Sequence, residues 1–145
     1  MSREENKDIV RRFHDGMLEF FRTGNLDFLL HTVHPDCAIG MPGMPATVDG
    51  MKQALPAFRT AFPDLCATMG EMLADGDKVA YRLTVTGTHT GEFMGTPATG
   101  KRITLTETHI DQVANGKIVR HDGDWDQMGM MQQLAVTPNG LVAQP

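Results

Sequence analysis

The residues best suited to chemistry lie late in the chain, in two alternating segments joined by Asn-Gly at 115–116. Such a pair is typical of a two-residue β-hairpin, because both central residues adopt a positive φ. Counting back from this turn pairs His109 with Asp122 and Glu107 with Asp124. All four side chains would then lie on one face, because side chains alternate between faces along a strand.

Three carboxylates around one imidazole are costly to bury unless they share protons or take part in chemistry. The same face also carries the apolar residues Ile103, Leu105 and Val113. A carboxylate in apolar surroundings has a pKa raised toward neutrality, which suits it to accept and return a proton. We therefore predict that Asp124, or Asp122, acts as acid/base beside His109. Two alternatives stay open: the face could be solvated, or a bulge before Asp124 could shift the register and exchange the faces.

Other side chains are candidates for contact with a substrate. Trp125 directly follows the aspartates, and Met128 lies just beyond it in a chain with 11 methionines. Methionine lines adaptable pockets, so a flat hydrophobic ligand would suit this region. Phe13 and Met17 lie on the apolar side of the first predicted helix. Arg82 lies in a strand where arginine is usually solvated, but it could also answer the carboxylates.

Length and composition are those of one globular domain covering residues 1–145, with a loosely ordered tail from about residue 137. The net charge of −5 makes nucleic acid an unexpected partner. No apolar run is long enough for a bilayer span, and the N-terminus lacks a signal peptide core. Cys37 and Cys66 fit no metal spacing and are expected to be buried free thiols, which favours a cytoplasmic protein without a metal site.

Apolar periodicity places helices before strands along most of the chain. The predicted helices are 3–22, 26–33 and 50–61, and the predicted strands are 37–41, 65–74, 78–88, 102–113 and 117–123. Separate blocks of helices and strands favour an α+β fold over a wound parallel sheet. We predict a cone-shaped, curved antiparallel sheet packed against three N-terminal helices and enclosing a cavity. His14 is expected to lie on the surface of the first helix.

The later part of the chain resembles the SnoaL-like polyketide cyclases, which belong to the wider group with the nuclear-transport-factor-2-like cone fold. The resemblance is carried by residues 86–102, 108–110, 115–118 and 126–134. It is dense over 84–135 and looser before that. In those cyclases it implies a cofactor-free intramolecular aldol condensation that closes the last ring of an aromatic polyketide.

The resemblance also implies roles for residues of this chain. In those cyclases a histidine on the penultimate strand helps bind the substrate, and His109 matches it, whereas Glu107 stands where they tend to carry glutamine. An aspartate near the end of the last strand acts as acid/base. Matched from the left it is Asp124; matched from the right the position is Gly123, with Asp122 and Asp124 on either side.

The expected partner is a small hydrophobic, polyketide-like substrate, and the resemblance suggests a homodimer or homotetramer built through the outer face of the sheet. Two other functions fit the same residues. The cavity could run another acid/base reaction, such as ketone isomerisation, epoxide hydrolysis or an assisted hydroxylation. It could also bind a small molecule without catalysis, because one fold hosts many functions.

Overall fold

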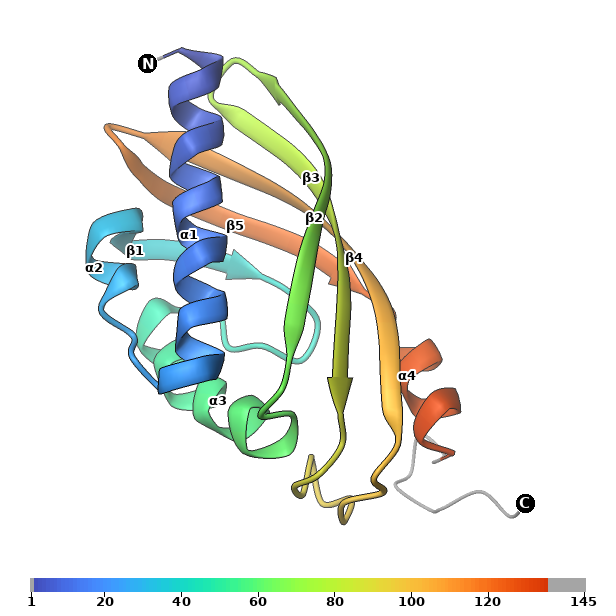
Figure 1. Cartoon of the computed structure of the whole chain (residues 1–145). Helices are drawn as coiled ribbons and strands as arrows, with labels where there is room; N and C mark the ends of the chain where they lie inside the picture. The colour runs from blue at the N-terminus through green and yellow to red at the C-terminus, as the bar shows by residue number, and fades with distance from the viewer. Residues whose placement is uncertain (1, 136–145) are drawn as a thin grey trace.

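Helix α1 spans Arg3–Thr23 and lies across one face of a five-stranded sheet in this computed structural model, which describes residues 2–135 (Figure 1). At its start the Glu5 amide donates to the Ser2 hydroxyl, and the Ser2 amide donates to the Glu5 carboxylate. This capping box satisfies backbone donors that have no partner within the helix. Gly24 ends the helix at φ 82°, a conformation that glycine adopts readily. The first predicted helix is confirmed.

Two further helices flank the first strand. Helix α2 (Phe28–Thr32) is shorter than predicted and leads directly into the sheet. Helix α3 (Val48–Ala61) begins two residues earlier than predicted, because the Thr47 hydroxyl accepts a hydrogen bond from the Gly50 amide and caps it. A fourth helix, α4 (Gln127–Leu134), follows the last strand.

The sheet has the order β1-β5-β4-β3-β2. Its strands are β1 (Val33–Gly40), β2 (Cys66–Asp75), β3 (Lys78–Thr88), β4 (Arg102–Ala114) and β5 (Lys117–Trp125). Three neighbouring pairs are antiparallel, but β1 runs parallel to β5. The predicted sheet was antiparallel throughout, and this part of the prediction is wrong. Parallel pairing is possible here because a long connection, not a hairpin, joins these two strands.

One face of the sheet turns inward and is covered by helices. Along β3 the residues Val79, Tyr81, Leu83 and Val85 are buried and alternate with more exposed ones. Helix α1 contacts β2, β3, β4 and β5, whereas α3 contacts β1. Figure 1 shows the twisted sheet bending past α1, with α3 near the end where α1 stops. This arrangement is the predicted α+β fold, and its helices cover the face on which the site must lie.

The hairpin of β4 and β5 contains a bulge close to its turn. Val113 pairs with Ile118, as the sequence predicts. The preceding residue of β4, Gln112, pairs with Arg120 and not with Val119. Val119 is therefore an extra residue of β5 without a partner in β4. A one-residue shift moves every later side chain of the strand to the other face.

This shift decides which residues of β5 reach the interior. His109 pairs with Gly123 and not with Asp122, so the predicted register is wrong beyond the bulge. Asp122 and Asp124 point to the outer face, where Asp124 is exposed, while His121 is buried on the inner face. The prediction that both aspartates share a face with His109 is therefore wrong.

Three smaller expectations can be set beside the structure. Cys37 is buried as predicted, but Cys66 is exposed, and both are free thiols. Within residues 2–135 no helix combines the length and apolar character that crossing a bilayer requires. The predicted loose tail from about residue 137 lies outside the described residues.

Candidate active site

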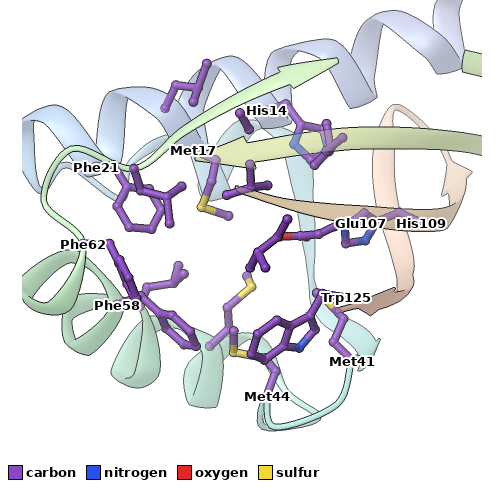
Figure 2. Close-up of a pocket in the computed structure, with 18 of the residues that line it drawn as sticks. His14, Met17, Phe21, Met41, Met44, Phe58, Phe62, Glu107, His109 and Trp125 are labelled. Carbon is purple, nitrogen blue, oxygen red and sulfur yellow. The ribbon is translucent and has the colours of Figure 1, made fainter. Parts of the chain in front are cut away.

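A cavity opens between α1, α3 and the inner face of the sheet (Figure 2). Its walls are almost wholly apolar and include Met17, Phe21, Met44, Phe58, Phe62 and Trp125. The free space between the lining atoms is about 1040 Å³ when the open mouth is counted. An apolar hollow with a few polar groups is the usual form of a small-molecule site.

Glu107 supplies the one carboxylate among the cavity-lining residues that the structure describes. It lies on β4 two residues from His109, and Figure 2 shows the two side chains next to each other at one wall. His109 Nε2 donates a hydrogen bond of 2.8 Å to Glu107 Oε1. The Glu107 side chain is 19% exposed and the His109 side chain 3%, so the carboxylate is the member of the pair that a ligand reaches first.

The backbone of Gly123 on β5 holds His109 in this orientation. A Cβ atom at Gly123 would lie only 2.2 Å from His109 Nδ1, so the ring packs directly over the glycine backbone. Nδ1 is buried there and has no hydrogen-bond partner among the described residues. The imidazole therefore acts on the cavity through Nε2.

A second polar unit lies beside this pair on the same face. The carboxylate of Asp111, which is 0% exposed, accepts a hydrogen bond of 2.8 Å from the Tyr81 hydroxyl and one of 2.6 Å from His121 Nδ1. The ring of His109 stacks against both outer rings, at 5.2 Å from Tyr81 and 4.9 Å from His121 between centroids. Both interplanar angles are small, 16° and 15°, so one carboxylate joins the two outer rings of a three-ring stack.

Burial and this carboxylate set the ionisation of the neighbouring groups. Burial alone would lower the pKa of His121, but the charge and hydrogen bond of Asp111 outweigh it, and the pKa is raised. Burial and the same carboxylate raise the pKa of Tyr81 well above its ordinary value. His14, on α1, has its pKa lowered to about 3, first by burial and then by the nearby His121. His14 is therefore neutral near pH 7.

Four predicted site residues do not line the cavity. Asp122 binds the Arg120 guanidinium at 2.6 Å on the outer face, and Asp124 is exposed there. Arg82 is also exposed, because it alternates with inward-facing neighbours along β3. Met128 is 57% exposed on α4. The other predicted residues, His109, Glu107, Trp125, Phe13 and Met17, do line the cavity.

The sequence reasoning missed four residues of the polar cluster. His14 was expected on the helix surface, yet its ring lies 4.8 Å from Tyr81 and it lines the cavity. Asp111 shares the face of His109 by simple alternation along the strand, whereas the register without a bulge turns His121 to the opposite face. The strict alternation of polar and apolar residues in β3 could have drawn attention to Tyr81, whose hydroxyl needs a partner when buried.

The donor set does not form a metal centre within residues 2–135, where no three His, Cys, Asp or Glu side chains are grouped to hold an ion. Hydrogen bonds of 2.6 to 2.8 Å join Glu107 to His109 and Asp111 to both Tyr81 and His121. The arrangement is suited to moving protons at the wall of an apolar space.

Comparison with known proteins also indicates an enzyme that acts on small molecules. The model of the SnoaL-like polyketide cyclase family matches residues 9–134. Aklanonic acid methyl ester cyclase DauD from Streptomyces sp. (strain C5) is 31% identical over 92% of this chain and 85% of its own length. AclR from Streptomyces galilaeus, a candidate hydroxylase, is 27% identical with a TM-score of 0.78 over 92% of this chain and 97% of its own.

A third structure supports the fold alone. The candidate SnoaL-like polyketide cyclase from Jannaschia sp. CCS1 has a TM-score of 0.83 at 19% identity, covering 94% of this chain and 95% of its own. At so low an identity, backbone similarity indicates a shared fold but does not indicate a shared reaction.

Proposed function

The chain belongs to the SnoaL-like polyketide cyclase family and is an enzyme of the cyclase type. From that premise we propose that it closes a ring in a polyketide-type ketone by acid/base-catalysed intramolecular aldol ring closure, without a cofactor and without loss of water. The observation that carries the proposal is the hydrogen bond between His109 Nε2 and Glu107 Oε1 at the wall of the apolar cavity. A base held by an oriented imidazole, in reach of a bound ketone, meets the geometric requirement for proton abstraction.

This proposal assigns the role of catalytic base to Glu107 and not to an aspartate of the last strand. Asp122 and Asp124 face outward, and the inward position that lies against His109 is Gly123. Glu107 accepts the proton from the carbon α to a carbonyl, and His109 holds the carboxylate in place through Nε2–H. The enolate then attacks a second carbonyl carbon of the same molecule, which forms the C–C bond and an alkoxide.

The surroundings of Glu107 support this role. Apolar side chains line most of the cavity, so a bound ketone displaces water from it and strengthens the electrostatic interactions within it. The conjugated system of a polyketide delocalises the enolate, so neither a metal nor a Schiff base is required for the step. A positioned acid/base contributes on the order of 10² to 10⁴ in rate.

The substrate class is proposed from the relatives. DauD is named for aklanonic acid methyl ester, so this compound is the first to try. We expect a product of unchanged mass that has lost one ketone, detected by mass spectrometry and ultraviolet absorption. Glu107→Gln should abolish most turnover, whereas Glu71→Gln, on the exposed side of β2, should not change it. Full turnover by Glu107→Gln would overturn the assignment.

AclR gives a second candidate function a specific basis, because it is a candidate hydroxylase with the same fold. A hydroxylation would add one oxygen to the product mass, which separates it from ring closure in the same assay. Recovery of bound but unchanged compound would instead indicate a binding module. The homodimer or homotetramer and the cytoplasmic location remain predictions; sedimentation of the purified chain tests the first.

A further inference from the structure

A ring closure needs two proton transfers, and Glu107 accounts for only one. The alkoxide formed at the attacked carbonyl must be neutralised, and a donor that is near the base but distinct from it protonates the oxygen without Glu107 having to reach both centres. Pairs of titratable groups whose surroundings push them apart in acidity are the usual solution in enzymes. The polar cluster behind His109 offers such a donor.

His121 lies at the cavity wall, on the opposite side of His109 from Tyr81. Its Nδ1 is taken by the Asp111 carboxylate at 2.6 Å, which leaves Nε2 as the ring nitrogen that can serve a bound molecule. His121 is buried, and the Phe13 ring packs against it at 5.2 Å between centroids, tilted by 57°, so the imidazole has little freedom to move. The ring stacks directly on His109 at 4.9 Å between centroids, so it lies next to the Glu107–His109 pair.

The carboxylate of Asp111 favours the protonated form of this imidazole. It is fully buried, and the Tyr81 hydroxyl fixes its second oxygen, so its charge is aimed at His121. The raised pKa of His121 agrees with this, since the effect of Asp111 outweighs the cost of burying the charged ring. A buried carboxylate that orients an imidazole and stabilises its cation is a well-established device in acid/base catalysis.

Among residues 2–135, the groups around His121 leave that effect in place. The titratable and charged groups that surround it are His14 on α1, Cys37 on β1, Tyr81 on β3, and Glu107, His109 and Asp111 on β4; Arg120 and Asp122 are its neighbours on β5, on the outer face. His14 stays neutral because its pKa is about 3, and burial raises the pKa of Cys37 to about 11. Burial also keeps Tyr81 in its neutral, hydrogen-donating form.

We infer that His121 is the general acid of the reaction, with Asp111 and Tyr81 as its positioning residues, so that base and acid come from two separate pairs on one wall. The inference rests on the proposed function. The C–H proton passes to Glu107, the C–C bond forms, the carbonyl π electrons move to oxygen, and His121 Nε2–H gives its proton to that oxygen. The product leaves with no net change in protons, and the two pairs return to their starting states by exchange with water.

The test joins a titration with a rate measurement. Long-range ¹H–¹⁵N spectra of histidine-labelled protein give the protonation state of His121 across about pH 5 to 9, with His121→Gln used to assign the signal. We expect the wild-type ring to remain protonated above the ordinary value near 6.5. In Asp111→Asn the transition should move to lower pH, and the alkaline limb of kcat on aklanonic acid methyl ester should move with it.

Rates of the variants separate a catalytic from a structural role. His121→Gln and Asp111→Asn should each lower kcat about 10²-fold, with KM changed much less. Tyr81→Phe keeps the ion pair and should cause a smaller loss. The matched control is Asp124→Asn, which removes an outer-face carboxylate from the same hairpin and should leave titration and rate as in the wild type.

Each result decides the matter. A kcat for His121→Gln within about twofold of wild type, or an alkaline limb that stays in place when the His121 transition moves, overturns the inference. So does a wild-type His121 that is already neutral near pH 6.5, even if Asp111→Asn fails to fold. If His121 titrates high but the wild type closes no ring, the proposed function fails and the acid role with it, while the Asp111–His121 pair stands.

Discussion

Gly123 lies against His109 across the β4–β5 ladder, so closely that a Cβ on the glycine would lie 2.2 Å from Nδ1, 2.7 Å from Cε1 and 3.0 Å from Cγ of the ring. The absence of a side chain at this position is what lets the imidazole lie flat on β5 and direct Nε2 at Glu107. At this position the last strand contributes space for the imidazole, whereas β4 contributes the Glu107 carboxylate.

Gly123→Ala is expected to damage catalysis more than folding. The added methyl group must push the His109 ring away from Glu107, and a misplacement of about 1 Å can cost on the order of 10² in rate. The measurement is kcat on aklanonic acid methyl ester together with a thermal melt. Gly87→Ala is the matched control on β3, because its Cβ would meet nothing nearer than 3.4 Å. Equal rates for both variants would show that the ring position does not matter.

Neutralising a carboxylate should lower the rate on the inner face of the hairpin and have little effect on the outer face. Glu107→Gln keeps the size of the side chain and removes the base, so kcat should fall by about 10² to 10⁴. Asp122→Asn and Asp124→Asn remove carboxylates of the outer face and should leave kcat within about twofold of the wild type. Steady-state kinetics on the three single variants decides it. Loss of activity in an aspartate variant alone would return the acid/base to the last strand.

His14 should make the fold sensitive to acid. Its pKa is lowered to about 3 by burial, so between about pH 6.5 and 3 the unfolded chain binds a proton that the folded chain does not. The contribution of His14 to stability is therefore complete above about pH 6.5 and is lost as the pH falls toward 3. From pH 6.5 to 5 this amounts to about 2 kcal/mol in the free energy of unfolding.

Urea unfolding of the wild type and His14→Phe at several pH values measures this effect. The phenyl ring fills the same space without a titrating nitrogen, so the variant should lose less stability between pH 6.5 and 5. His121 acts with the opposite sign: its raised pKa adds stability at low pH that disappears as the pH rises through the folded value. Parallel curves for the two proteins would contradict the assignment to His14.

Trp125 is expected to control access to the cavity. Its Nε1–H donates a 2.9 Å hydrogen bond to the Pro42 carbonyl, which ties the loop bearing Met41 and Met44 to the end of β5. Trp125→Phe keeps an aromatic wall but removes the donor. Loss of one such bond should raise KM roughly fivefold with little change in kcat. A lowered kcat at unchanged KM would instead place Trp125 in the chemical step.

Short-range patterns in the sequence were enough for most of the elements. The Ser2–Glu5 capping box and Gly24 bound the first helix, because both act within one helical turn. The strand over Lys78–Thr88 follows from alternation along the chain. The Asn-Gly turn correctly paired Val113 with Ile118, since a turn dictates the register of its nearest residues.

The composition of the site depended on tertiary structure. One extra residue, Val119, exchanges the faces of everything that follows it in β5, and no local pattern requires it. Packing decides: without the bulge, Asp122 and Asp124 would enter an apolar cavity, and burying a carboxylate costs several kcal/mol. With the bulge both aspartates stay on the outer face, while His121 turns inward and binds Asp111 on β4.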